Sequence, residues 1–288
     1  MQLQLDRFCS TMRLNMRSRP PAQRRPPIRA RLTLTMQIGK HSRKLMELRK
    51  AIRNGALTSD GLLPIEGPIL LEEAHRSGLE IIDIFVRTGL ALPAVSPDAI
   101  HDVPADIFKT IQDTEHSQGV IATVRPRQFT LGHVLTASPA LLVVLVRLQD
   151  PGNLGTTLRI GESFGATGCI ALPGTVSFYN SKVARASAGS IFRLPHAARI
   201  NIDEIAHALR SRNIAIVGTS PAATTTIEKW DWRQPTAVLV GNEGSGLSSE
   251  ELAYCDTVLR IPHKTTVESL NSAIATAVVL YEAFRQRS

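Results

Sequence analysis

Apolar and polar residues follow two alternating patterns along the second half of the chain, and together they predict short strands separated by helices. Residues 141–146 read Leu-Leu-Val-Val-Leu-Val, a continuous apolar run typical of a central parallel strand buried on both faces. Further strands are predicted at residues 169–172, 214–217, 237–240 and 257–261. Helices are predicted at residues 154–164, 202–212 and 270–284. This alternation predicts an α/β domain, with a parallel sheet covered on both faces, over residues 141–288.

The preceding part of the chain shows the same alternation on a smaller scale. Helices are predicted at residues 44–52, 68–77 and 104–112, and strands at residues 81–86 and 120–124. Residues 37–125 are therefore predicted to form a small α/β domain. Residues 126–140 contain two prolines and a glycine, and are predicted to be the linker between the domains.

Residues 1–36 are rich in arginine and proline and show no sustained periodicity, which favours a disordered extension. An organellar transit peptide is an alternative, and an over-extended start is another because Met36 opens the regular pattern. Residues 1–53 hold 14 basic residues (Lys or Arg) and 2 acidic residues (Asp or Glu). The rest of the chain holds 19 basic and 23 acidic residues. The net charge of +8 therefore comes from the N-terminal segment, which is typical of a nucleic-acid-binding arm or of a tail without a defined partner.

Composition excludes several classes of protein. Apolar residues make up 43% of the chain, but no apolar run approaches the ~18 residues that span a bilayer. We therefore expect no membrane partner and a cytoplasmic protein, or a mitochondrial one if residues 1–36 act as a transit peptide. Three widely separated cysteines form neither a metal-binding spacing nor a disulfide framework, so we expect no metal and a reducing compartment.

Candidate chemistry gathers just after the predicted strands. The strand at residues 257–261 is stopped by Pro262, and Glu268, Ser269 and Asn271 lie at the entry of the last helix. Open α/β sheets bind ligands at such loops. The same residue types also cap helices, so this stretch alone does not distinguish a site from a capped helix.

Two other strands are followed by unusual loops. Asp-Pro-Gly-Asn at residues 150–153 is a turn in which Asn153 or Thr156 could cap the next helix, which carries Arg159. Three glycines at residues 241–246 allow a ligand to approach the backbone closely. Their spacing differs from the dinucleotide fingerprint, and no acidic residue sits on a strand ~20 residues later. A solvated helix arginine and a plain glycine turn are the alternatives.

The stretch at residues 181–190 places Lys182 and Arg185 on one helical face, with Ser187 nearby. This arrangement suits phosphate contact, although an ordinary surface helix would look similar.

The order of these four stretches resembles the SpoU (TrmH) family of RNA 2′-O-ribose methyltransferases. Residues 141–286 carry the family's three motifs and its S-K-x-x-R-A-S-A-G segment. Residues 41–125 resemble its small substrate-binding domain more loosely, mainly through Ile65-Glu66-Gly67. The resemblance implies a SPOUT-type parallel sheet with a deep trefoil knot, a homodimer, and S-adenosyl-L-methionine as cofactor.

The resemblance also implies roles for individual residues. Those implied to contact the cofactor are Thr219, Gly241, Ile261 and Leu270. Those implied to be catalytic are Arg159, Asn153, Glu243, Ser269 and Asn271, and those expected to bind RNA are Lys182, Arg185 and Ser187. His263 and Lys264 depart from the family pattern, where many members carry Met and a small residue.

A ribose 2′-hydroxyl is a poor nucleophile, so the protein must align it and assist its deprotonation. Because a guanidinium normally stays protonated, phosphate clamping and hydroxyl orientation are favoured over general-base catalysis for Arg159. Ribosomal RNA is favoured over transfer RNA because family members with a separate substrate domain tend to act on it. The alternatives are a non-catalytic RNA-binding or ribosome-assembly factor and, disfavoured by its missing fingerprint, a nicotinamide dehydrogenase.

Overall fold

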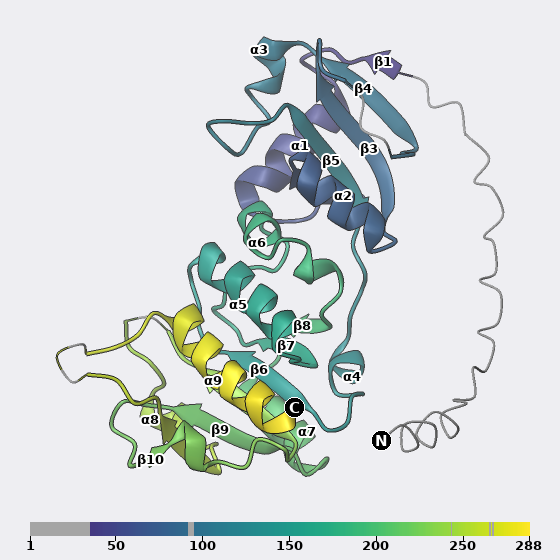
Figure 1. Cartoon of the computed structure of the whole chain (residues 1–288). Helices are drawn as coiled ribbons and strands as arrows, with labels where there is room; N and C mark the ends of the chain where they lie inside the picture. Colours follow the sequence, from purple (N-terminus) through teal and green to yellow (C-terminus); the bar gives the residue numbers. More distant parts are fainter. Residues whose placement is uncertain (1–34, 92–94, 243, 265, 267) are drawn as a thin grey trace, which may run out of the picture. The chain divides into compact units, whose positions relative to one another are not determined.

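The computed structural model describes residues 35–91, 95–242, 244–264, 266 and 268–288, which belong to one compact unit. The first part of this chain forms a five-stranded mixed sheet with strand order β1-β4-β3-β5-β2 (Figure 1). Its strands are β1 (Thr35–Gln37), β2 (Leu63–Glu66), β3 (Glu80–Arg87), β4 (Ala99–Val103) and β5 (Val120–Arg125). Its helices are α1 (Arg43–Asn54), α2 (Pro68–Arg76) and α3 (Ala105–Phe108).

The predicted pattern holds for α1, α2, β3 and β5, but the structure corrects it in three places. The predicted helix at residues 104–112 is helical only over α3. The strands β1, β2 and β4 were not predicted. The predicted boundary between residues 36 and 37 lies inside β1, which pairs in parallel with β4 through Met36 and His101. A three-residue strand is too short to show a period, so only its partner reveals it.

The second part forms a seven-stranded sheet, ordered β10-β12-β9-β11-β6-β7-β8, in which every pair is parallel. The strands are β6 (Leu141–Leu145), β7 (Gly168–Ala171), β8 (His196–Ala198), β9 (Ala215–Thr219), β10 (Thr225–Thr226), β11 (Thr236–Val240) and β12 (Thr257–Arg260). This confirms the predicted α/β class with a parallel sheet. The short edge strands β8 and β10 were not predicted.

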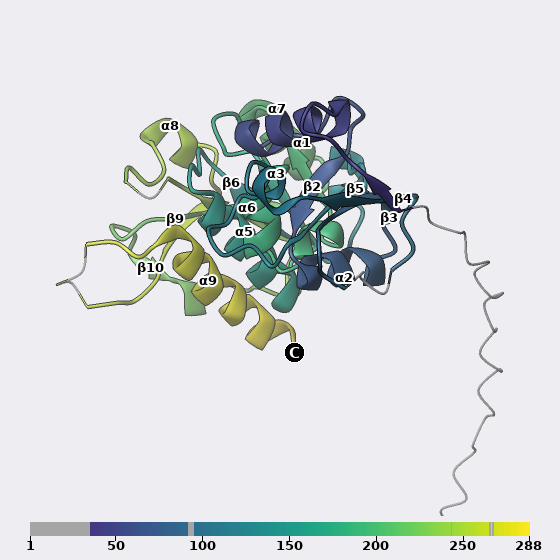
Figure 2. The same cartoon turned by 90° about the horizontal axis from the view of Figure 1, so that it is seen from above.

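Helices α5 (Pro151–Ser163) and α9 (Ser272–Arg287) lie side by side on one face of this sheet (Figures 1 and 2). The remaining helices are α4 (Leu131–Val134, within the predicted linker), α6 (Ser181–Ala186), α7 (Ile202–Arg210), α8 (Ser249–Leu252), and the 3-10 helices η1 (Ser190–Phe192) and η2 (Ile227–Lys229). Among the described residues, no helix is both long and apolar enough to cross a bilayer.

The central strand β6 explains why both faces of the sheet are covered. Each of its five residues is at most 1% exposed. Leu141, Val143 and Leu145 pack in the cluster that includes the apolar residues of α5 and α9. Leu142 and Val144 pack in the cluster that includes those of α7. Burying each of these side chains contributes roughly 1.5–3 kcal/mol, which makes a continuous apolar run the stable choice here.

The order of the strands brings three loops together. Strand β9 lies between β11 and β12, and Leu239 pairs with Gly218 while Leu259 pairs with Thr219. Because all three strands run in the same direction, their carboxyl ends meet at one edge of the sheet. The predicted trefoil knot depends on the path after β12, where residues 265 and 267 lie outside the described residues, and it stays a prediction.

A buried polar cluster crosses the first sheet. The Asp83 carboxylate accepts hydrogen bonds from His101 Nε2 (2.7 Å) and from Lys44 Nζ, and Thr123 Oγ1 donates to it at 3.4 Å. Asp83 and His101 are 5% and 2% exposed. Burial raises the pKa of Asp83, but the hydrogen bonds from His101 and Lys44 outweigh burial, so its pKa lies below its usual value.

The substitution Asp83→Asn is therefore expected to lower the free energy of unfolding by about 1–3 kcal/mol at neutral pH. Because the folded-state pKa is depressed, this contribution is present above the unfolded pKa of about 4 and is lost as the pH falls below it. Denaturant unfolding at pH 7 and pH 3 checks both points. Glu80→Gln is the control, since its pair with Arg125 is more than half exposed and should contribute less than about 1 kcal/mol. Equal losses for both variants would contradict a special role for Asp83.

Candidate functional site

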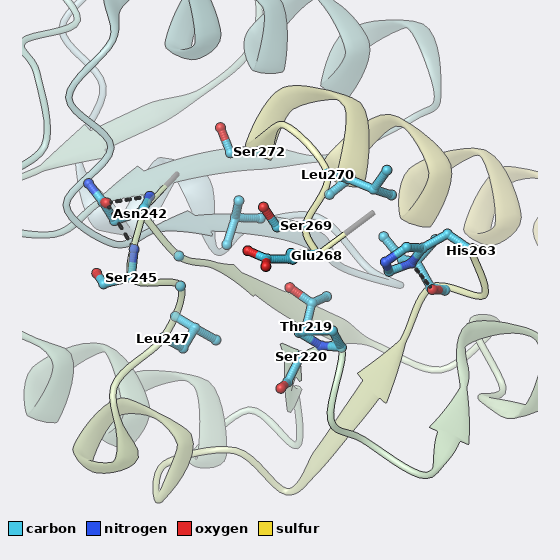
Figure 3. A pocket seen from close by; sticks show the side chains of 17 residues that line it. Thr219, Ser220, Asn242, Ser245, Leu247, His263, Glu268, Ser269, Leu270 and Ser272 are labelled. Atoms are coloured by element: carbon cyan, nitrogen blue, oxygen red, sulfur yellow. Dashed lines mark hydrogen bonds between the residues drawn. The ribbon is translucent and has the colours of Figure 1, made fainter. Parts of the chain in front are cut away.

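The three loops that meet at the edge of the second sheet enclose a cavity of about 440 Å³ (Figure 3). This volume falls within the range of about 300–1,000 Å³ that is usual for small-molecule sites. All four residues implied to contact a cofactor line the cavity: Thr219, Gly241, Ile261 and Leu270. Thr219 ends β9, Gly241 and Ile261 follow β11 and β12, and Leu270 precedes α9, so the strand order brings them together.

Gly241 marks where the backbone closes around the cavity. A Cβ atom at this position would lie 2.3 Å from the carbonyl carbon of Gly246 and 2.6 Å from the amide nitrogen of Leu247. The glycine is therefore required because two backbone segments approach each other closely. Next to it, the Asn242 side chain accepts hydrogen bonds from the amides of Gly244 (2.9 Å) and Ser245 (3.4 Å).

The loop after β12 brings polar side chains to the same cavity. Glu268 and Ser269 lie between the Asn242 loop and Thr219 (Figure 3). His263 also lines the cavity, and its Nδ1 donates to the Ile261 carbonyl at 2.8 Å because a carbonyl can only accept. The sequence marked His263 only as a departure from the family pattern, and it did not single out Ser220, Asn242 or Leu247, which also line the cavity.

Asn153 and Asn271 are 118 residues apart in the chain but hydrogen-bonded in the structure. Asn271 Nδ2 donates to Asn153 Oδ1 at 3.1 Å, which ties the start of α9 to the start of α5. Asn271 is also the N-cap of α9, accepting from the amides of Ala273 (3.0 Å) and Ile274 (3.2 Å). The capped helix and the pairing with Asn153 therefore use different atoms of one side chain.

The cap of α5 corrects a prediction. Asp150, and neither Asn153 nor Thr156, is the N-cap, since its carboxylate accepts from the Asn153 amide at 2.7 Å. Pro151 then occupies the first helical position, where no amide hydrogen is needed. The Asn153 side chain instead contacts Asn271.

Arg159 lies two turns into α5 with an exposed side chain. Among the described residues, none forms an ion pair or hydrogen bond with its guanidinium. Its charge is therefore available to an anionic ligand. Glu243, which was predicted to help hold Arg159, lies outside the described residues.

The helix α6 packs against α5 with little space between them. A Cβ atom at Gly155 would lie 2.5 Å from Ala186 Cβ and 2.9 Å from the Ser187 amide nitrogen. Ser187 is fully buried, and its hydroxyl donates to the Ala184 carbonyl at 2.8 Å. A buried hydroxyl cannot reach a phosphate, so the small residues of this stretch, Ser187 included, serve helix packing.

The two basic residues of α6 differ from each other. Lys182 is exposed, whereas Arg185 forms an ion pair with Asp113 at 2.7 Å, and Ser181 Oγ donates to the same carboxylate. Burial raises the pKa of Asp113, but the hydrogen bonds from Ser181 and Arg185 outweigh it and lower the pKa. The charge of Arg185 is thus already compensated within the protein, and Lys182 is the more accessible cation of the pair.

Comparison with known proteins gives the same assignment as the four stretches. The SpoU rRNA Methylase family matches residues 140–281. An uncharacterized tRNA/rRNA methyltransferase of Synechocystis sp. is 37% identical over 84% of this chain and 90% of its own length. The 23S rRNA (guanosine-2′-O-)-methyltransferase of Ralstonia nicotianae is 32% identical over 68% of this chain and 82% of its own length. The chain belongs to the SpoU rRNA methylase family.

Two solved structures of methyltransferases share the fold over most of this chain. A crystal structure of an RNA 2′-O ribose methyltransferase is 29% identical, with a TM-score of 0.75 over 88% of this chain and 99% of its own. The SpoU methyltransferase AviRb from Streptomyces viridochromogenes, in complex with AdoMet, is 25% identical, with a TM-score of 0.76 over 85% of this chain and 98% of its own. The predicted family and fold class are confirmed.

Two glycines in one loop give a matched test of this SpoU cavity. Gly241→Ala is expected to weaken binding of S-adenosylhomocysteine by about tenfold or more, because the methyl group forces the loop away from Gly246. Gly244→Ala is the control, since its Cβ would meet only the Asn242 side-chain oxygen at 3.5 Å. Titration calorimetry measures both. Similar affinities for the two variants would show that the close approach at Gly241 does not shape the site.

Proposed function

We propose that this protein transfers a methyl group from S-adenosyl-L-methionine to the 2′-hydroxyl of a ribose in RNA, with ribosomal RNA as the favoured substrate. One observation carries the proposal. Three adjacent strand ends and the segment before α9 bring four family-implied cofactor residues around one cavity, and the Asn153–Asn271 pair joins the start of α5 to the start of α9. The 23S rRNA methyltransferases among the relatives support ribosomal RNA over transfer RNA.

The cavity suits the proposed cofactor. Its lining combines apolar side chains such as Ile261 and Leu270 with residues of the loop after β11, which we call the glycine loop (described residues 241–242 and 244–247). The missing Cβ of Gly241 lets the backbone of this loop pack closely against itself beside the cavity. Ser269 and Glu268 add polar groups on the side of α9. When bound there, S-adenosyl-L-methionine supplies a methyl group on a sulfonium, which is a good leaving group.

The residues of the chain then have to hold the ribose, so that its oxygen bonds the methyl group as the sulfur–methyl bond breaks and the hydroxyl proton passes to solvent water. Arg159 carries a permanent positive charge on an exposed face of α5 and is proposed to clamp the phosphate next to the target ribose. Fixing that phosphate aligns the 2′-hydroxyl for attack. Asn153 and Asn271, held by their mutual hydrogen bond, are proposed to orient the hydroxyl, together with Ser269 and Glu243. Lys182 is proposed to extend the RNA contact, with Arg185 in a lesser role.

Replacing Arg159 separates catalysis from cofactor binding. Arg159→Ala is expected to lower methyl transfer by about 100-fold or more, because the alignment of the ribose is lost. Binding of S-adenosylhomocysteine should stay within about twofold, since Arg159 does not line the cavity. Transfer of labelled methyl groups to RNA and titration calorimetry measure the two effects. Arg212→Ala, an exposed arginine just after α7, is the control, and equal loss of transfer and of cofactor binding by Arg159→Ala would contradict the proposed role.

We also propose that the protein acts as a homodimer through α9. Four large apolar side chains of this helix are at least 37% exposed: Ile274, Val278, Tyr281 and Phe284. Their spacing of four, three and three residues places them on one face of the helix. An apolar stripe of this kind is costly to leave in water and is typical of a protein interface. The stripe begins three residues after Asn271, so a partner there would border the proposed site.

Charge placed in this stripe is expected to separate the subunits. Tyr281→Asp should shift the mass measured by light scattering at micromolar concentration from dimer to monomer, because a buried carboxylate without a partner strongly opposes association. Ile69→Asp is the control, since Ile69 is 71% exposed on α2, away from this helix. A wild-type protein that is already monomeric would overturn the dimer.

The target nucleotide can be identified by mapping ribose methylation in cellular RNA. Ribose methylation mapped in RNA from a deletion strain and its parent should show one site that loses its methyl group. The competing function is a non-catalytic RNA-binding or ribosome-assembly factor, which would leave every methylated position unchanged and would bind no cofactor. A cytoplasmic location is part of the proposal and is tested by fractionation.

A further inference from the structure

Arg147, the second residue after β6, contacts both the start of the glycine loop and the helix α8 that follows this loop. Its backbone carbonyl accepts a hydrogen bond from Asn242 Nδ2 at 3.0 Å, at the start of the loop. Its guanidinium forms two parallel hydrogen bonds with the carboxylate of Glu251, in the helix that follows the loop, the Nη2–Oε2 bond being 3.1 Å. One residue therefore joins β6 to both sides of a loop that lies about 100 positions later in the chain.

The contact with Asn242 sets the shape of the loop. Because Nδ2 of Asn242 donates to Arg147, its Oδ1 faces the other way and accepts from the amides of Gly244 and Ser245. The Asn242 carbonyl accepts from the Gly246 amide at 2.9 Å. Gly244, Ser245 and Gly246 all line the cavity. The orientation of one amide, fixed by the Arg147 carbonyl, thus decides where the cavity wall lies.

The contact with Glu251 secures the far end of the loop. The side chain of Glu251 is 11% exposed, and its Oε2 also accepts from the Ser248 amide at 2.7 Å in the capping box of α8. A carboxylate so nearly buried requires a compensating charge, and Arg147 provides it with bidentate geometry. Loss of the guanidinium would leave Glu251 uncompensated and free the start of α8 from β6.

The backbone of Arg147 is itself unusual. Its φ angle is 54°, in the left-handed region that residues with a side chain adopt rarely. This conformation accompanies both contacts, the carbonyl to Asn242 and the guanidinium to Glu251. Strained residues of this kind persist where the surrounding structure requires them, often beside a binding site.

We propose that Arg147 is a positioning residue that holds the glycine loop in its ligand-binding shape before the methyl donor arrives. Arg147 is outside the cavity lining, so it acts through Asn242 and Glu251 and touches neither ligand nor reacting atoms. The inference rests on the proposed function, because it assigns the loop to the methyl donor. A loop ordered in advance binds more tightly, since less conformational freedom is lost on binding.

Arg147→Ala removes the guanidinium but keeps the backbone carbonyl, and is expected to raise the dissociation constant for S-adenosylhomocysteine by about tenfold. The KM for S-adenosyl-L-methionine should rise by a similar factor while kcat stays within about threefold, since Arg159 and the Asn153–Asn271 pair are untouched. Arg147→Lys keeps the charge and is expected to recover part of the affinity. Arg233→Ala is the control, because Arg233 forms an exposed ion pair with Asp231 on the same domain and should leave the dissociation constant unchanged.

The outcomes separate this inference from the proposed function. If the wild-type protein binds no S-adenosylhomocysteine, the proposed function and the inference both fail. If the wild-type protein binds S-adenosylhomocysteine and Arg147→Ala binds it equally well, the proposed function stands and the inference is overturned. The same holds if Arg147→Ala lowers kcat but leaves the dissociation constant unchanged. Should Arg147→Ala not fold, Glu251→Gln decides: it keeps the shape but removes the charge, and an affinity within twofold of wild type overturns the inference.

Discussion

The hydrogen bonds that pair β9 with β11 on one side and with β12 on the other are the constraint on which the site depends. These three strands are far apart in the chain, yet their parallel pairing brings the residues after Thr219, Val240 and Arg260 to one edge. The continuous burial of β6 supports this arrangement, because it fixes the sheet between two helical layers. The cavity is therefore formed by loops at the edge of a sheet whose strands are fixed in place.

The site divides its tasks between backbone and side chains. The wall of the cavity is made largely by loop backbone, with Gly241 providing the close approach and Asn242 the turn. The groups proposed to orient the ribose come instead from the starts of α5 and α9, where Asn153 and Asn271 meet. Arg147 lies in the segment between β6 and α5, the helix that carries Arg159. This segment therefore also contacts the glycine loop, through Asn242.

Packing explains part of a pattern that also suggested ligand binding. The small residues Ala186 and Ser187 lie where α6 approaches Gly155 of α5, and larger side chains would force the helices apart. Arg185, in the same helix, is held by Asp113. The sequence of such a helix therefore does not distinguish residues that pack against a neighbouring helix from residues that contact RNA.

Much of the second domain follows from the sequence alone, because long apolar runs and periodic helices are local properties. The runs at β6, β11 and β12 and the helices α5, α7 and α9 lie close to their predicted positions. The short strands β1, β8 and β10 cannot be predicted from the sequence, because two or three residues are too few to show the alternation of a strand. Only pairing with a neighbouring strand defines them. The four implied cofactor residues could be named from motif order, whereas the contacts of Asn271 with Asn153, and of Arg147 with Asn242 and Glu251, could not. Each of these joins residues about 95 to 118 positions apart, and only the order of strands in the sheet decides which distant residues become neighbours.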